Sequence, residues 1–288
     1  MLIILLTVAD VIGISLQNVL KKGYDNRSAS PGVFYFGAVM SVSAMLVFLL
    51  NGIGSLCFVP AVLPYSAGFA VSYFAAIAGQ FLALRYGPLS LTSLIGSYSL
   101  LLPTLYGLIF LHDDISPLFF PGLALLALSL LLIYLKRNRE KSVTAISSKW
   151  IVFLVIGFVG NGMCSVVQKM QQNSMNGQFK NELMVYALLM IAVLMLLSGR
   201  IAERGQLRTT LKEGWKFAIP CGLCNGVVNL LTMVLAGRMA ASVEFPILSA
   251  GSLVVTFLFS VFLYREKLSL RQWIGAAVGV ASIVLLSI

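Results

Sequence analysis

A single carboxylate stands inside the first apolar stretch of this sequence. Residues 7–17 read TVADVIGISLQ, and the neighbours of Asp10 cannot solvate a charge. Gly13 and Gln17 follow at i+3 and i+7, so a helix would place all three on one face. A low dielectric disfavours the charged form of a carboxyl, so Asp10 could hold either a proton or a cation. This competition predicts proton-coupled exchange centred on Asp10; a structural Asp10, bonded to a neighbouring helix, is the alternative.

Polar side chains also recur at helical spacing in later apolar segments. Asn161 and Gln168 share one face of their segment, and Asn225 and Asn229 share a face of another. Amides at these positions can bind a ligand or hydrogen-bond to the opposite helix, and both uses stay open.

An aromatic stripe runs along residues 65–80, where Tyr73 and Gln80 lie at helical spacing. Such a wall could hold cations through π interactions, with ordinary packing as the alternative. The residues expected to contact a solute, from all these segments, are Gln17, Tyr73, Gln80, Ser97, Asn161, Gln168, Asn225 and Asn229.

Two further acids lie near the ends of apolar segments. Glu182 begins one segment and Glu244 lies four residues inside another. We expect them to mark the outer mouth of a pathway. For Glu244, an ion pair with the nearby Arg238 is the simpler alternative.

Motifs of catalysis are absent from the sequence. It contains no G-x-x-x-x-G-K-[ST], no H-E-x-x-H and no G-x-S-x-G. We therefore expect neither an enzyme nor an ATP-driven pump, and no catalytic residue, metal or cofactor.

The composition is typical of a membrane protein. Of 288 residues, 59% are hydrophobic and 10% are charged, whereas soluble domains carry about 25% charged residues. Apolar runs of about 20 residues are long enough to cross a bilayer. Their lack of apolar–polar alternation argues against a barrel. The ten predicted spans are 2–20, 33–50, 61–84, 89–111, 117–135, 150–168, 183–199, 215–236, 240–263 and 270–287.

The chain repeats itself at an offset of 153 positions. At this offset Gly122 aligns with Gly275, and Ser129 aligns with Ser282. Residues 1–140 and 141–288 are therefore predicted to be two five-helix repeats. Because five is an odd number, the second repeat must be inverted in the membrane, as in many secondary carriers. The fold class is accordingly an all-α polytopic membrane protein with ten transmembrane helices in two inverted repeats.

The basic residues predict an orientation. Seventeen Lys and Arg residues lie in or beside the odd-numbered loops and three in or beside the even-numbered ones. Cytoplasmic loops carry the excess of positive charge, so both termini are expected outside. The basic residues follow the loops rather than forming a patch with aromatics, which argues against nucleic-acid binding.

Ten spans in two inverted halves resemble the EamA-type branch of the drug/metabolite transporter superfamily. The resemblance is carried by the repeated unit from Arg85 to Ser116 and from Arg238 to Ser269, and by the stretch YREKLSLRQWIGAAVGVASIVLL. The ADVIG stretch is similar to the Ala-Glu-Val-Ile-Gly of the small multidrug resistance proteins, in which protons and cations share the carboxylate. That likeness implies the same role for Asp10, although the second repeat has no equivalent acid.

Together, these features predict a secondary transporter that exports a cationic or zwitterionic metabolite, amine or drug in exchange for protons. Its expected partners are a small-molecule solute, protons and membrane lipid, and it would be a monomer or a homodimer. Its expected location is the cell membrane, the inner or plasma membrane of a bacterium. The alternatives are an importer or exchanger of a neutral or anionic metabolite with a structural Asp10, and a lipid-flipping protein without solute turnover.

Overall fold

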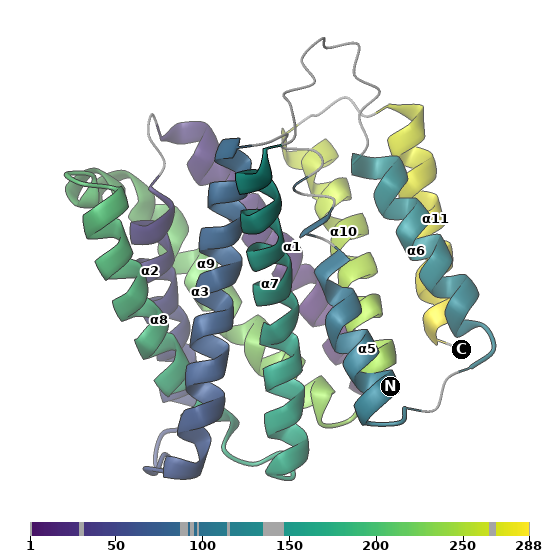
Figure 1. Cartoon of the computed structure of the whole chain (residues 1–288), viewed down its shortest axis with the longest axis horizontal. Helices are drawn as coiled ribbons and strands as arrows, with labels where there is room; N and C mark the ends of the chain where they lie inside the picture. The colour runs from purple at the N-terminus through teal and green to yellow at the C-terminus, as the bar shows by residue number, and fades with distance from the viewer. Residues whose placement is uncertain are drawn as a thin grey trace. The chain divides into compact units, whose positions relative to one another are not determined.

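The structure is a computed structural model of the whole chain (Figure 1). The residues that it describes are 2–28, 32–86, 92, 95–96, 98–113, 116–134, 147–264 and 269–287.

The described residues form ten α-helices and no strand. Of these described helices, five fall within residues 1–140 and five within residues 141–288. The first five are α1 (Leu2–Arg27), α2 (Val33–Asn51), α3 (Leu63–Tyr86), α5 (Leu101–Phe110) and α6 (Phe119–Tyr134). The second five are α7 (Ser148–Ser174), α8 (Lys180–Ala202), α9 (Leu207–Ala236), α10 (Ala241–Tyr264) and α11 (Leu270–Ser287).

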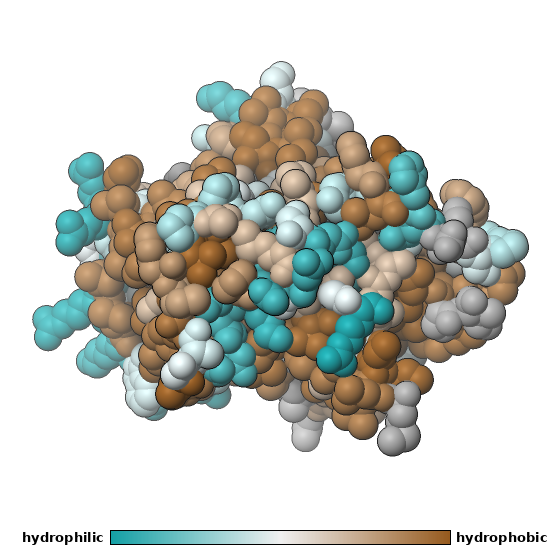
Figure 2. Space-filling view, turned by 90° about the horizontal axis from the view of Figure 1, so that it is seen from below, coloured by the Kyte–Doolittle hydropathy of each residue, from teal (hydrophilic) through white to brown (hydrophobic). Residues whose placement is uncertain are grey.

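Length and composition qualify these helices as membrane spans. Six described helices are long and apolar enough to cross a bilayer, and four more are apolar but shorter. Large apolar side chains are exposed on most of them, and apolar residues cover much of the face seen in Figure 2. Soluble proteins do not expose contiguous apolar surface on this scale. The chain is therefore an all-helical, polytopic membrane protein, as the sequence predicts.

Three helices extend beyond one end of the predicted spans by about two turns. The helix α1 continues to Arg27, α7 continues to Ser174, and α9 begins at Leu207 instead of residue 215. The added turns contain Lys, Arg, Gln and Glu, which lower the hydropathy without disfavouring a helix. Part of the predicted fourth span, 89–111, lies outside the described residues.

Contacts divide the chain into two compact units, residues 1–74 with 167–238 and residues 75–166 with 239–288. Each unit combines a segment of the first predicted repeat with a segment of the second. The helices α3 and α7 each contribute residues to both units.

In the first unit, α9 packs against both α1 and α2, and α2 also packs against α8. A buried cluster of Tyr24, Phe36, Met40, Ala218 and Cys221 joins α1, α2 and α9.

A carboxylate caps α2 in the same unit. The two carboxylate oxygens of Glu203 accept hydrogen bonds from the backbone N–H groups of Phe34 (2.8 Å) and Tyr35 (3.1 Å). This satisfies two of the donors that a helix N-terminus leaves unpaired, and the negative charge suits that end of the dipole.

In the second unit, α6 and α11 lie side by side (Figure 1) and are joined by a reciprocal pair of hydrogen bonds. The Ser129 hydroxyl donates to the carbonyl of Gly275 at 2.7 Å, and the Ser282 hydroxyl donates to the carbonyl of Gly122 at 2.8 Å. The two serines are repeat equivalents, and so are the two glycines. Each helix therefore donates the same bond to the other, as two copies related by a two-fold axis would.

Candidate functional site

The side chain of Asp10 is completely buried, with 0% of its surface exposed. The hydroxyl of Thr232, on α9, donates a hydrogen bond of 2.9 Å to Asp10 Oδ2. Asp10 Oδ1 is also buried and has no hydrogen-bond partner among the described residues. The carboxyl thus meets a neutral donor on one oxygen and none on the other.

The face of α1 that carries Asp10 packs against α9. A Cβ atom on Gly13 would lie 2.6 Å from Cγ2 of Val228, so the helices approach closely at this point. One turn further along, Asn225 Nδ2 donates to Gln17 Oε1 at 2.9 Å. Asp10 and Gln17 therefore meet Thr232 and Asn225 in antiparallel order, seven residues apart on each helix.

A chain of amides continues from this contact to α7. Asn229 Nδ2 donates to Asn225 Oδ1 at 3.2 Å, and Gln168 Nε2 donates to Asn229 Oδ1 at 2.9 Å. Gln17, Asn225, Asn229 and Gln168 thus connect α1, α9 and α7. Each amide has both donors and acceptors, so any of these side chains can exchange a hydrogen bond to its neighbour for one to a solute.

A buried cation lies at the end of the same helix face. The ammonium of Lys169, on α7, donates to the carbonyl of Ala236, which is the last residue of α9. Lys169 is 5% exposed, and the C-terminal end of a helix dipole favours a positive charge. Ala236 follows Thr232 by four residues, which is about 6 Å along the helix.

We use the name "α9 polar face" for Asn225, Asn229, Thr232 and Ala236 together with their partners. These four residues stand at i, i+4, i+7 and i+11, which is one side of an α-helix. All of them belong to the first unit, as do their partners on α1 and α7. The face brings a carboxyl, an ammonium and four amides together within one compact unit.

Other predicted site residues make separate contacts. Tyr73 packs on the apolar cluster around Tyr24 and stacks on Phe69. In the second unit, Asn161 Nδ2 donates to the hydroxyl of Ser99 at 2.5 Å. Gln80 also belongs to the second unit, where its amide lies beside Gly96. Ser97 is outside the described residues.

The two predicted mouth acids are both buried at the start of a helix. Glu182, in the first turn of α8, accepts a weak hydrogen bond from the Cys57 thiol at 3.8 Å. Tyr186, one turn later, donates to the backbone carbonyl of Cys57 at 3.1 Å. Glu244 lies in the first turn of α10, in the second unit, and is 1% exposed.

Two functional side chains of the α9 polar face, those of Thr232 and Lys169, are absent from the sequence predictions. Thr232 stands seven residues after Asn225, so its spacing on the shared face was a usable signal. Lys169 is the only charged residue from 150 to 174, and a charge inside an apolar helix is by itself a functional signal. No group of three or more metal-ligating side chains occurs among the residues that the structure describes.

Comparison with known proteins agrees with this architecture. A solved crystal structure superposes on the chain with a TM-score of 0.81 at 15% sequence identity, covering 98% of both chains. At this identity the likeness concerns the fold alone. No curated protein sequence matches the chain.

The family comparison concerns the second repeat. Residues 146–288 match the sequence model of the EamA-like transporter family, whose members are membrane transporters of small solutes. The matched segment contains α7 to α11, including the whole α9 polar face apart from its partners on α1. The resemblance to the EamA-type drug/metabolite transporters is therefore confirmed for residues 146–288, and the chain is a multi-pass membrane protein.

Proposed function

We propose that this protein is a proton-coupled secondary transporter of a cationic or zwitterionic solute, with Asp10 as the coupling carboxyl. The observation that carries the proposal is the burial of Asp10 against a neutral partner, Thr232, on a helix face that also bears hydrogen-bonding amides. Export in exchange for protons is the direction that the family resemblance favours.

The hydrogen-bond partner of Asp10 among the described residues, Thr232, carries no charge. A carboxylate in a spanning helix costs about 2.5–3.5 kcal/mol on insertion scales. The Thr232 hydroxyl offers a hydrogen bond but no charge, so it offsets this cost only in part. Binding a proton or a cationic group removes the remainder. Because one carboxyl cannot carry both at once, binding of the solute would displace the proton.

The amides of the α9 polar face fit the remaining requirements of a solute site. Gln17, Gln168 and Asn225 are buried and Asn229 is partly buried. The four amides are joined by hydrogen bonds, and Asn225 and Asn229 lie on the same side of α9 as Thr232. A solute that bonds to Asn225 or Asn229 would replace bonds that the amides now make to one another. Rocking of the helix bundle would then expose this face alternately to the two sides of the membrane.

Flux in proteoliposomes tests the proposal. Purified protein is reconstituted with a pH-sensitive dye inside the vesicles, and ethidium, putrescine or a mixture of amino acids is added outside. We expect at least one probe to cause proton movement that Asp10→Asn abolishes. Glu213→Gln, a matched carboxamide change at an exposed position of α9, should leave the movement intact.

A structural Asp10 is the competing account, and the Thr232 bond is the observation in its favour. In that case Asp10→Asn would lower the melting temperature and leave the proton-coupled flux of the folded fraction unchanged. Scrambling of labelled phospholipid, without competition by any soluble probe, would instead support a lipid-flipping protein.

A further inference from the structure

The helix α9 is longer than a membrane requires. Its 30 residues extend over about 45 Å, whereas the hydrocarbon core is about 30 Å thick. Every charged residue of α9 lies between Leu207 and Lys216, and the remaining residues 217–236 carry no charge. The uncharged part is long enough to span, so the first ten residues belong at the membrane surface.

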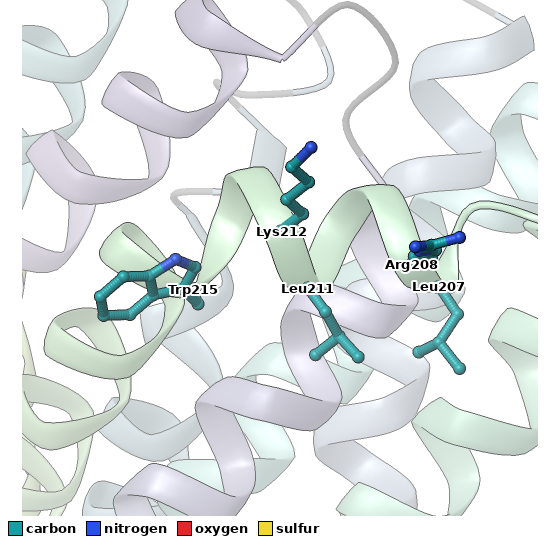
Figure 3. Close-up of a pocket in the computed structure, with 5 residues that line it drawn as sticks. All are labelled: Leu207, Arg208, Leu211, Lys212 and Trp215. Carbon is teal, nitrogen blue, oxygen red and sulfur yellow. The ribbon is translucent and has the colours of Figure 1, made fainter.

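This surface segment has two adjacent stripes. Leu207, Leu211 and Trp215 stand at i, i+4 and i+8 and are 40%, 45% and 49% exposed. Arg208 and Lys212 stand one position after the two leucines and are exposed as well. Figure 3 shows Leu207 and Leu211 pointing to the same side of α9, with Lys212 projecting away from them.

The five side chains line a surface hollow of about 490 Å³ (Figure 3). The inner side of the same segment is held by packing, because Thr210 and Gly214 are buried. The hollow therefore lies on the side that faces away from the protein core. Its apolar stripe borders the core side and its basic stripe lies further out.

The charge around the hollow is strongly positive. Lys216 continues the basic stripe, and Arg200 and Arg204 are exposed just before α9. Two acids near these residues in the sequence make contacts with other helices. Glu203 is buried as the cap of α2, and Glu213 accepts a hydrogen bond from Ser28 at 3.5 Å. Among the residues that the structure describes, no acid lies on the stripe that Arg208, Lys212 and Lys216 form.

From this arrangement, we propose that the surface segment of α9 binds an anionic phospholipid. The phosphate would contact Arg208 and Lys212, and an acyl chain would lie along Leu207, Leu211 and Trp215. An acidic protein or a free phosphate would satisfy the basic stripe and leave the exposed apolar stripe in water. Trp at the interface and a basic cluster at a helix end are both typical of lipid contacts.

The predicted orientation of the chain places this segment on the side of the membrane that is rich in anionic lipid. Residues 200–214 form an odd-numbered loop region, which the loop charges assign to the cytoplasm. Anionic lipids give the cytoplasmic leaflet its negative surface potential. The inference concerns a surface remote in sequence from Asp10 and does not depend on the transport mechanism.

Binding is tested on the purified, delipidated protein in a mild detergent. Dioleoylphosphatidylglycerol, dioleoylphosphatidylcholine and glycerol phosphate are added separately and followed by native mass spectrometry and thermal unfolding. We expect phosphatidylglycerol to remain bound and to raise the melting temperature, with little effect of the other two. In the double variant Arg208→Gln/Lys212→Gln, the affinity for phosphatidylglycerol should fall at least about threefold.

Two controls keep the result interpretable. Lys149→Gln removes an exposed charge next to another odd-numbered loop and should bind like the wild type. Arg208→Lys/Lys212→Arg keeps both charges and should retain binding, which separates loss of charge from misfolding. Equal retention of phosphatidylcholine, competition by glycerol phosphate, or an unchanged double Gln variant would each overturn the proposal.

Discussion

The Thr232 hydroxyl on α9 donates a 2.9 Å hydrogen bond to the buried carboxyl of Asp10 on α1. These residues are 222 positions apart in the sequence and belong to different predicted repeats. The bond therefore links the single membrane carboxyl of the first repeat to the polar face of the second. A transporter that uses one carboxyl can couple it to both halves of the chain in this way.

Thr232→Val tests the importance of this bond. Valine has nearly the shape of threonine but leaves Asp10 without its donor, and a hydrogen bond to a charged group contributes about 1.5–3 kcal/mol. We expect the rate of proton-coupled flux to fall about tenfold. Thr232→Ser keeps the hydroxyl and should retain most of the rate. Equal rates for the valine and serine variants would show that the hydroxyl has no role.

Close packing at Gly13 gives a second prediction. A methyl group at this position meets Val228, whose branched side chain has few alternative rotamers. Gly13→Ala should therefore lower the stability in detergent by about 1–3 kcal/mol. Adding Val228→Ala makes room and should restore most of the loss. If the double variant is no more stable than Gly13→Ala, the contact does not set the distance between α1 and α9.

The Gln17–Asn225 bond can be measured by a double-mutant cycle. The single variants Gln17→Leu and Asn225→Leu each leave one amide without its partner, whereas the double variant removes both. Coupling energies of about 0.6 kcal/mol are typical between membrane helices. We expect a favourable coupling of this size in unfolding experiments. A coupling indistinguishable from zero would remove this bond from the account.

The exposed Cys57 reports the orientation of the chain. It lies in residues 51–60, an even-numbered loop, while Cys164 and Cys221 are buried and Cys224 is partly buried. The charge bias places this loop outside the cytoplasm. A membrane-impermeant maleimide should therefore label intact cells at Cys57, and Cys57→Ser should abolish the labelling. Labelling that requires cell lysis would contradict the predicted orientation.

Helices were predictable from the sequence because the bilayer imposes a simple rule. Each span needs about 20 apolar residues, and the predicted segments contain the centres of the observed helices. The ends were harder to predict, since the added turns of α1, α7 and α9 carry polar and charged residues that lower the hydropathy. The offset of 153 positions identified Ser129 and Ser282 as equivalents. Their reciprocal bonds to Gly275 and Gly122 required the structure.

The polar face was predictable only within each helix. Helical spacing placed Asp10 and Gln17 on one side of α1, and Asn225 and Asn229 on one side of α9. Which helix faces which is decided by packing between distant segments, so Thr232 was not identified as the partner of Asp10. For Tyr73, helical spacing alone left a cavity wall and ordinary packing open, and the structure shows it packed against the apolar cluster around Tyr24.

The central claim is that Asp10 exchanges a proton for the solute, and proton flux in Asp10→Asn proteoliposomes tests it most directly. Asparagine keeps the size of the side chain and can still accept the Thr232 bond, but it cannot release a proton. The account predicts that the probe that drives proton movement in the wild type drives none in this variant. An unchanged melting temperature should show that the variant is folded. Undiminished proton movement in Asp10→Asn would contradict the account.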